Sequence, residues 1–283
     1  MTSVRQTMPR ARRRYVQWLA RAGYAARGLV FVIVACFTAI AAVDANTRPV
    51  DGKDALRALL AQPFGGALLI VVAAGLTCFA LWRAAQSILD ADRLGPDAKG
   101  LARRVVYGAA GLFYLGFAYV ALSMLVGVHT SSTERVVRDW TGRLLSQPLG
   151  DVIVGVIGVA IIVTGLCIGI AGVRAEFRTR IALKEKPRRW VTALGRAGYL
   201  TRAAVISLIG LFVLFAALHA NAHEATGLSG ALLAIKRQTY GGALLAITAV
   251  GLFAFGAYGL AEALYRRIDG RCFTTKVPAW LSM

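Results

Sequence analysis

The stretch VIVGVIGVAIIVTGLCIGIAGV, residues 152–173, contains no charged residue over its whole length. A helix needs about 20 predominantly apolar residues to cross the hydrocarbon core of a bilayer. A helix that is apolar around its whole circumference must be surrounded by lipid or by other parts of the protein. The stretch therefore predicts a membrane-spanning helix.

Five other segments of the chain have the same character. Hydrophobic residues make up 57% of the 283-residue chain, whereas soluble domains contain about 45–50% apolar residues. The excess is concentrated in segments as long as membrane spans, which predicts an all-α integral membrane protein with six transmembrane helices. The expected spans are 25–43, 65–82, 105–128, 149–173, 200–219 and 241–265.

Lysine and arginine are distributed unevenly between the two sides of the predicted membrane. The chain contains 33 of them against 14 acidic residues, and 25 fall in the termini and the two connections that share one side. Cationic residues are retained on the cytoplasmic side, so both termini are expected there. Anionic lipid headgroups at that face are the expected partners. Nucleic acid explains the charge less well, because the basic segments lack interleaved aromatic residues.

A short phrase introduces every second span. It reads LAQPFGGALL at 60–69, LSQPLGDVIV at 145–154 and KRQTYGGALL at 236–245. The other three spans begin near Tyr24, Tyr107 and Tyr199. The chain therefore consists of three two-helix repeats of the same orientation, which are expected to be related by an axis along the membrane normal. This predicts a pseudo-threefold bundle.

The predicted organisation follows from these repeats. Each outer loop has apolar residues at helical spacing, which predicts a short amphipathic helix in the plane of the interface. These loop segments are 54–62, 134–145 and 229–236. The predicted boundaries are a basic cytoplasmic tail at 1–17, repeats at 18–90, 101–174 and 193–268, and a cytoplasmic tail at 269–283.

A second phrase, Arg-Ala-Gly-Tyr-x-x-Arg, occurs at 21–27 and again at 196–202. The middle repeat keeps Tyr107 but has Val106 in place of the glycine and Ala110 in place of the second arginine. Together with the spacing of the three repeats, these motifs resemble the bacterial membrane proteins of domain-of-unknown-function family 1206. The resemblance covers roughly residues 18–268. It implies a six-helix integral membrane protein and no established activity.

Two interpretations of the arginine-tyrosine phrase stay open. In the favoured one the phrase is an anchor, with tyrosine rings at headgroup depth and arginines that extend to lipid phosphates. In the other, the arginines face the bundle axis and form an intramembrane polar site. Glu262 is a candidate partner for Arg27 or Arg202, or for Arg266 one turn later in its own helix. The candidate site residues are Arg27, Arg202, Glu262, Tyr24, Tyr107 and Tyr199.

The sequence contains no recognisable catalytic motif. We expect no catalytic residues, no cofactor and no metal, and we expect the protein not to be an enzyme. Two interpretations stay open for a group of polar residues on the predicted outer side. One is a cation site, and the favoured one is a set of solvated loop residues. The residues are Asp44, His129, His219, His223 and Glu224. The favoured function is a structural or accessory membrane protein, and the alternative is a transporter or channel for a small solute or ion along the pseudo-threefold axis. A continuous polar axis would favour transport, and an apolar plugged axis would favour the structural role.

Overall fold

The computed structural model describes residues 10–44, 46–88, 97–128, 131–175 and 185–265, with the single residues 90 and 95. This part of the chain contains helices and no strands. The helices are α1 (Arg10–Val43), α2 (Gly52–Leu60), α3 (Gly65–Ile88), α4 (Ala98–Leu125), α5 (Thr133–Leu145), α6 (Gly150–Arg174), α7 (Glu185–Leu218), the 3₁₀ turn η2 (Ala222–Glu224), α8 (Leu228–Lys236) and α9 (Gly241–Tyr265).

Six of these helices, α1, α3, α4, α6, α7 and α9, are long and apolar enough to cross a membrane. This confirms the six predicted spans. The first and fifth differ from the prediction at their starts, because α1 and α7 begin well before residues 25 and 200. The polar segments there contain several arginines and alanines, which favour helix, so each helix continues outward from its span.

The short helices α2, α5 and α8 precede α3, α6 and α9, and they confirm the expected loop helices. Asp51 caps α2 by accepting the backbone N–H of Lys53 and of Asp54. After each short helix comes the Gln-x-x-Gly phrase, whose glycines are Gly65, Gly150 and Gly241. A Cβ on any of these glycines would overlap a carbonyl oxygen in the last turn of the preceding short helix. The phrase therefore marks a turn that only glycine fits.

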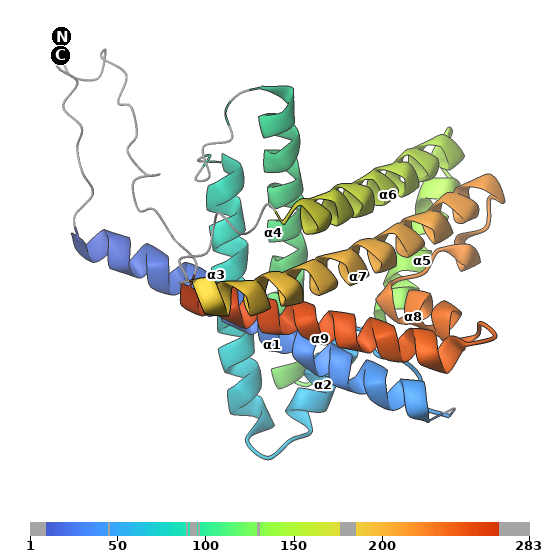
Figure 1. Cartoon of the computed structure of the whole chain (residues 1–283). Helices are drawn as coiled ribbons and strands as arrows, with labels where there is room; N and C mark the ends of the chain where they lie inside the picture. Colours follow the sequence, from blue (N-terminus) through green and yellow to red (C-terminus); the bar gives the residue numbers. More distant parts are fainter. Residues whose placement is uncertain are drawn as a thin grey trace, which may run out of the picture.

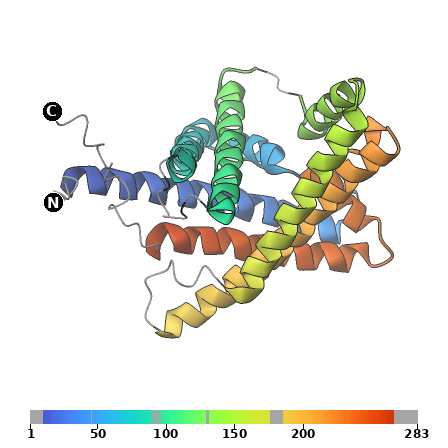
Figure 2. The ribbon, with the colours of Figure 1, turned by 90° about the horizontal axis from the view of Figure 1, so that it is seen from above.

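The six spans pack in the order α4, α3, α1, α9, α7, α6. The three most extensive pairs, α3 with α4, α1 with α9, and α6 with α7, each join two different repeats. Figure 1 shows α3 and α4 running steeply across α1 and α9, and Figure 2 shows α6 and α7 lying side by side. α1 and α9 lie in the middle of the order, so each has a span on both sides.

The three inter-repeat pairs share one register. A Cβ on Gly256 of α9 would lie 2.8 Å from the carbonyl oxygen of Gly28 in α1. At the equivalent positions of the other repeats, a Cβ on Gly165 of α6 would lie 3.0 Å from the carbonyl oxygen of Ala203 in α7. A Cβ on Gly111 of α4 would lie 3.3 Å from the carbonyl oxygen of Ala80 in α3. Small residues permit this close approach of helix backbones.

The middle repeat departs from the other two. Within the first and third repeats, a Cβ on the glycine of the arginine-tyrosine phrase would lie 2.6 Å or 2.5 Å from a phenylalanine Cα in the second span: Gly23 against Phe79, and Gly198 against Phe255. In the middle repeat these two positions hold Val106 and Thr164. Among the described residues, α4 and α6 share at most a marginal contact. The bundle is therefore a ring that is open within the middle repeat.

Candidate functional site

A buried ion pair joins the first and third repeats. Nη2 of Arg27 in α1 donates to Oε2 of Glu262 in α9 over 2.8 Å, and each side chain is only 3% exposed. Arg27 is thus one of the three partners predicted for Glu262, and Arg266, another of the three, lies outside the described residues. Because a buried charge is costly unless it is paired, this pairing accounts for both groups inside the bundle.

Aromatic rings surround the Arg27 guanidinium on three sides. Its Cζ lies 5.2 Å from the ring centroids of Tyr24 and Phe79 and 5.0 Å from that of Phe255. Arginine is attracted to the faces of such rings, and the attraction strengthens where water is excluded. The rings come from α1, α3 and α9, so the guanidinium is held by three helices of two repeats.

Arg202 also contacts the ring of Phe255. Its Cζ is 4.8 Å from the Phe255 ring centroid and 5.9 Å from that of Phe31, and the side chain is half-buried. Within the described part of the chain, no acidic side chain forms an ion pair with Arg202. The structure therefore brings Arg27 and Arg202 to one site, but only Arg27 has a carboxylate partner.

A third arginine, Arg83 in α3, completes the group, and the sequence analysis did not identify it as a site residue. Its Cζ lies 5.0 Å from the ring centroid of Phe79 and 4.7 Å from that of Tyr107, and its Nη1 donates to Gln86 Oε1 over 3.1 Å. The sequence did contain an indication of this part of the site, because Gln86, the hydrogen-bond partner of Arg83, occupies in the first repeat the position that Glu262 occupies in the third. We call Arg27, Arg83, Arg202, Glu262, Phe79 and Phe255 the arginine–aromatic cluster.

The tyrosines of the phrase lie in different surroundings. Tyr24 is fully buried, whereas Tyr107 and Tyr199 are half-buried. The Tyr24 ring contacts Phe79 edge-on at 5.2 Å, so it faces protein and not lipid. The anchor interpretation therefore does not describe Tyr24 or Arg27. The physical reason is the position of α1 in the middle of the ring, where α3 and α9 cover both of its sides.

The cluster holds more positive than negative charge. Three guanidinium groups face one carboxylate, and the charge of Arg202 lies within electrostatic range of Arg27 and Arg83. Nε of Arg27 and Nε of Arg83 are buried, and neither has a hydrogen-bond acceptor in the described part of the chain. Chemically, such a cluster is suited to holding a negatively charged group, since guanidinium groups bind carboxylates and phosphates through paired N–H donors.

The outer histidines do not gather into a metal site in the described part of the chain. Nδ1 of His219 lies 2.8 Å from Oε2 of Glu224 at the surface, and the backbone N–H of His223 donates to Asn221. No group of three or more potential metal ligands occurs among the residues that the structure describes. His129 lies outside those residues.

On the outer side, polar contacts connect the repeats to one another; we call three of them, one for each pair of repeats, the outer ties. Nζ of Lys53 donates to the carbonyl oxygen of Ser131, and the Ser229 hydroxyl donates to Glu134 over 3.0 Å. Nζ of Lys236 donates to the carbonyl oxygen of Thr47 over 2.6 Å. Burial lowers the pKa of the Lys53 ammonium. Each tie joins two different repeats, so together they hold all three.

The fold and the cluster define a class: an integral membrane protein built from three two-helix repeats. The family model described as Domain of Unknown Function (DUF1206) matches three times, at 22–90, 105–175 and 197–266, and the chain belongs to this family. An uncharacterized protein of Bacillus subtilis (strain 168), YxxB, is 29% identical over 257 residues, which covers 90% of this chain and 92% of the relative. No solved structure matches.

Proposed function

We propose that the protein is a non-enzymatic structural or accessory protein of the bacterial inner membrane, with both termini in the cytoplasm. The observation that carries this proposal is the filling of the bundle interior by apolar side chains. One continuous apolar core extends through the first and third repeats and includes part of α4. Its largest fully buried aliphatic members are Val34, Leu56, Leu69, Leu76, Leu232, Leu245 and Leu252.

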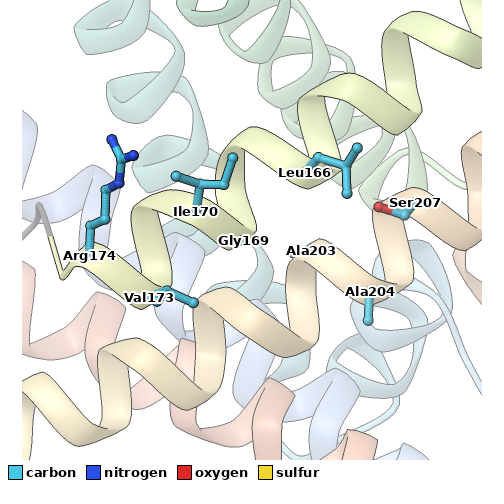
Figure 3. Close-up of a pocket in the computed structure, with 9 residues that line it drawn as sticks. Leu166, Gly169, Ile170, Val173, Arg174, Ala203, Ala204 and Ser207 are labelled. Atoms are coloured by element: carbon cyan, nitrogen blue, oxygen red, sulfur yellow. The ribbon is translucent and has the colours of Figure 1, made fainter.

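The position of the buried charges supports the same proposal. Arg27 and Glu262 form a buried ion pair beside this core, and aromatic rings contact the Arg27 guanidinium. Beyond Arg27 along α1, the buried residues Val30 and Val34 are apolar, and the buried Thr38 hydroxyl donates to the carbonyl oxygen of Val34 in its own helix. A groove of about 540 Å³ does lie between α6 and α7, but its lining is mostly apolar or glycine, with Arg174 at one end (Figure 3). A polar layer bounded by apolar side chains supports a packed scaffold.

The alternative is a transporter, and the observation that favours it is the arginine–aromatic cluster itself. Ionisable groups inside a membrane bundle often mark pathways for ions or solutes. A transporter must open an aqueous route past the apolar core, whereas a structural protein keeps it dry.

Thiol accessibility separates the two proposals. Val34→Cys would be placed in a background in which the natural cysteines are replaced by serine. Val34 is 1% exposed, and Val43, at the outer end of the same helix, is 92% exposed and serves as the control position. We expect a membrane-impermeant methanethiosulfonate to modify position 43 and not position 34. Modification of position 34 from either side would overturn the structural proposal.

A further inference from the structure

Arg202 occupies in the third repeat the position that Arg27 occupies in the first, but the residue that corresponds to Glu262, the partner of Arg27, is not acidic. Glu262 is 24 residues after Gln238, and the residue 24 positions after Gln147 is Ala171. The pairs α1 with α9 and α7 with α6 share one register, in which Ala203 and Gly165 correspond to Gly28 and Gly256. Ala171 therefore occupies, opposite Arg202, the position that Glu262 occupies opposite Arg27.

Among the residues that the structure describes, no carboxylate compensates the charge of Arg202. The guanidinium contacts the faces of Phe31 and Phe255, and no described acidic residue pairs with it. The charge of Arg83 lies within electrostatic range of Arg202, and among the described residues its side chain contacts the amide of Gln86 and the rings of Phe79 and Tyr107. Two uncompensated guanidinium groups in partly dehydrated surroundings are costly, and an anion bound between them offsets that cost.

We propose that Arg202, together with Arg83, binds a phosphate-class oxyanion. A phosphate group presents several acceptor oxygens to two separate guanidinium forks, and its negative charge offsets part or all of theirs. Both arginines are half-buried, so a ligand can reach them from outside. Arg83 lies five residues before the end of α3 at Ile88, about 7 Å along the helix axis. Lipid headgroups carry phosphate near this depth, and free phosphate offers the same chemistry.

The site is testable by phosphate binding to the purified full-length protein. In uncharged detergent and phosphate-free buffer, we expect inorganic phosphate to raise the midpoint of thermal unfolding with a saturable dose dependence, and equal chloride not to. In lipid nanodiscs, phosphatidylglycerol is compared with phosphatidylcholine. A response to inorganic phosphate identifies the free anion as a ligand, and a response confined to phosphatidylglycerol identifies the headgroup. Either supports the site; no response to either probe overturns it.

Two variants assign the response to Arg202. Arg202→Gln is expected to weaken binding by about tenfold or more, because a hydrogen-bonded charge is lost. The matched control is Arg196→Gln, which removes the same charge from an exposed position of α7. Ala171→Glu supplies the missing carboxylate and is expected to abolish the response while raising the midpoint without ligand. If Arg202→Gln does not fold, Ala171→Glu decides alone: an unchanged phosphate response in that variant overturns the proposal.

Discussion

Nη2 of Arg27 lies 2.8 Å from Oε2 of Glu262, and this contact joins residues 235 positions apart in the sequence. It connects the first span to the last, so the two ends of the membrane domain are fixed to each other by a buried ion pair. Removing one member of such a pair is expected to be more harmful than removing both, because a single deletion leaves a buried charge without a partner.

Glu262→Gln is therefore expected to destabilise the protein by about 3–5 kcal/mol. The double change Arg27→Met with Glu262→Met is expected to recover most of that loss, because it leaves no buried charge. The measurement is the thermal unfolding midpoint in detergent. Arg57→Gln is the control, since it breaks the exposed Arg57–Asp54 pair and should cost less than about 1 kcal/mol. A double variant as unstable as Glu262→Gln would contradict this account.

The glycines of the arginine-tyrosine phrase are expected to tolerate no side chain. A Cβ on Gly23 or Gly198 would lie 2.6 Å or 2.5 Å from a phenylalanine backbone atom, which cannot move aside as a side chain can. Gly23→Ala and Gly198→Ala should each cost about 1–3 kcal/mol or more. Gly116→Ala is the control, because nothing lies within 4 Å of its Cβ position, and alanine there should stabilise α4 slightly. Equal effects at the three positions, measured as membrane yield and unfolding midpoint, would refute the packing argument.

The sequence predicted the six spans and the three repeats because both depend on local patterns: apolar length and the recurrence of short phrases. It could not determine which side of each helix faces protein. Tyr24 is buried because α1 lies between two other spans, and this neighbourhood is a property of the whole bundle. Val106 marked the middle repeat as different, but only the structure shows that α4 and α6 separate there.

Disulfide trapping tests the open ring. A Cβ on Gly169 of α6 would lie 3.4 Å from the Cβ of Ala203 in α7, close to the separation found in disulfides, and Figure 3 shows the two residues on adjacent helices. In a background without the natural cysteines, Gly169→Cys with Ala203→Cys is expected to crosslink on mild oxidation. Val106→Cys with Thr164→Cys, the positions that would meet in a closed ring, is expected not to. Efficient crosslinking of the second pair would show a closed ring.

Lys53, which forms one of the outer ties, is expected to make the free energy of unfolding increase as the pH rises above neutral. Burial lowers the folded-state pKa below the ordinary value of 10.5, so the folded protein loses this proton at a lower pH than the unfolded chain does. The charged ammonium thus costs stability at neutral pH, and the cost disappears as the pH rises through the folded-state pKa. Relative to Lys53→Met, the wild type should gain stability between neutral pH and about pH 10. Arg138→Met, an exposed change in α5, should show no such trend.

The orientation in the membrane is the last prediction, and it rests on the concentration of 25 of the 33 cationic residues on one side. Cysteines introduced at Ser131, between α4 and α5, and at position 184, between α6 and α7, lie on opposite sides of the membrane if the six spans alternate. In intact cells without natural cysteines in this protein, a membrane-impermeant maleimide applied from the periplasm is expected to label position 131 only. Position 184 should become reactive after the cells are opened, which controls for intrinsic accessibility. Labelling of position 184 in intact cells would reverse the orientation and place the basic connections outside, against the tendency of lysine and arginine to remain in the cytoplasm.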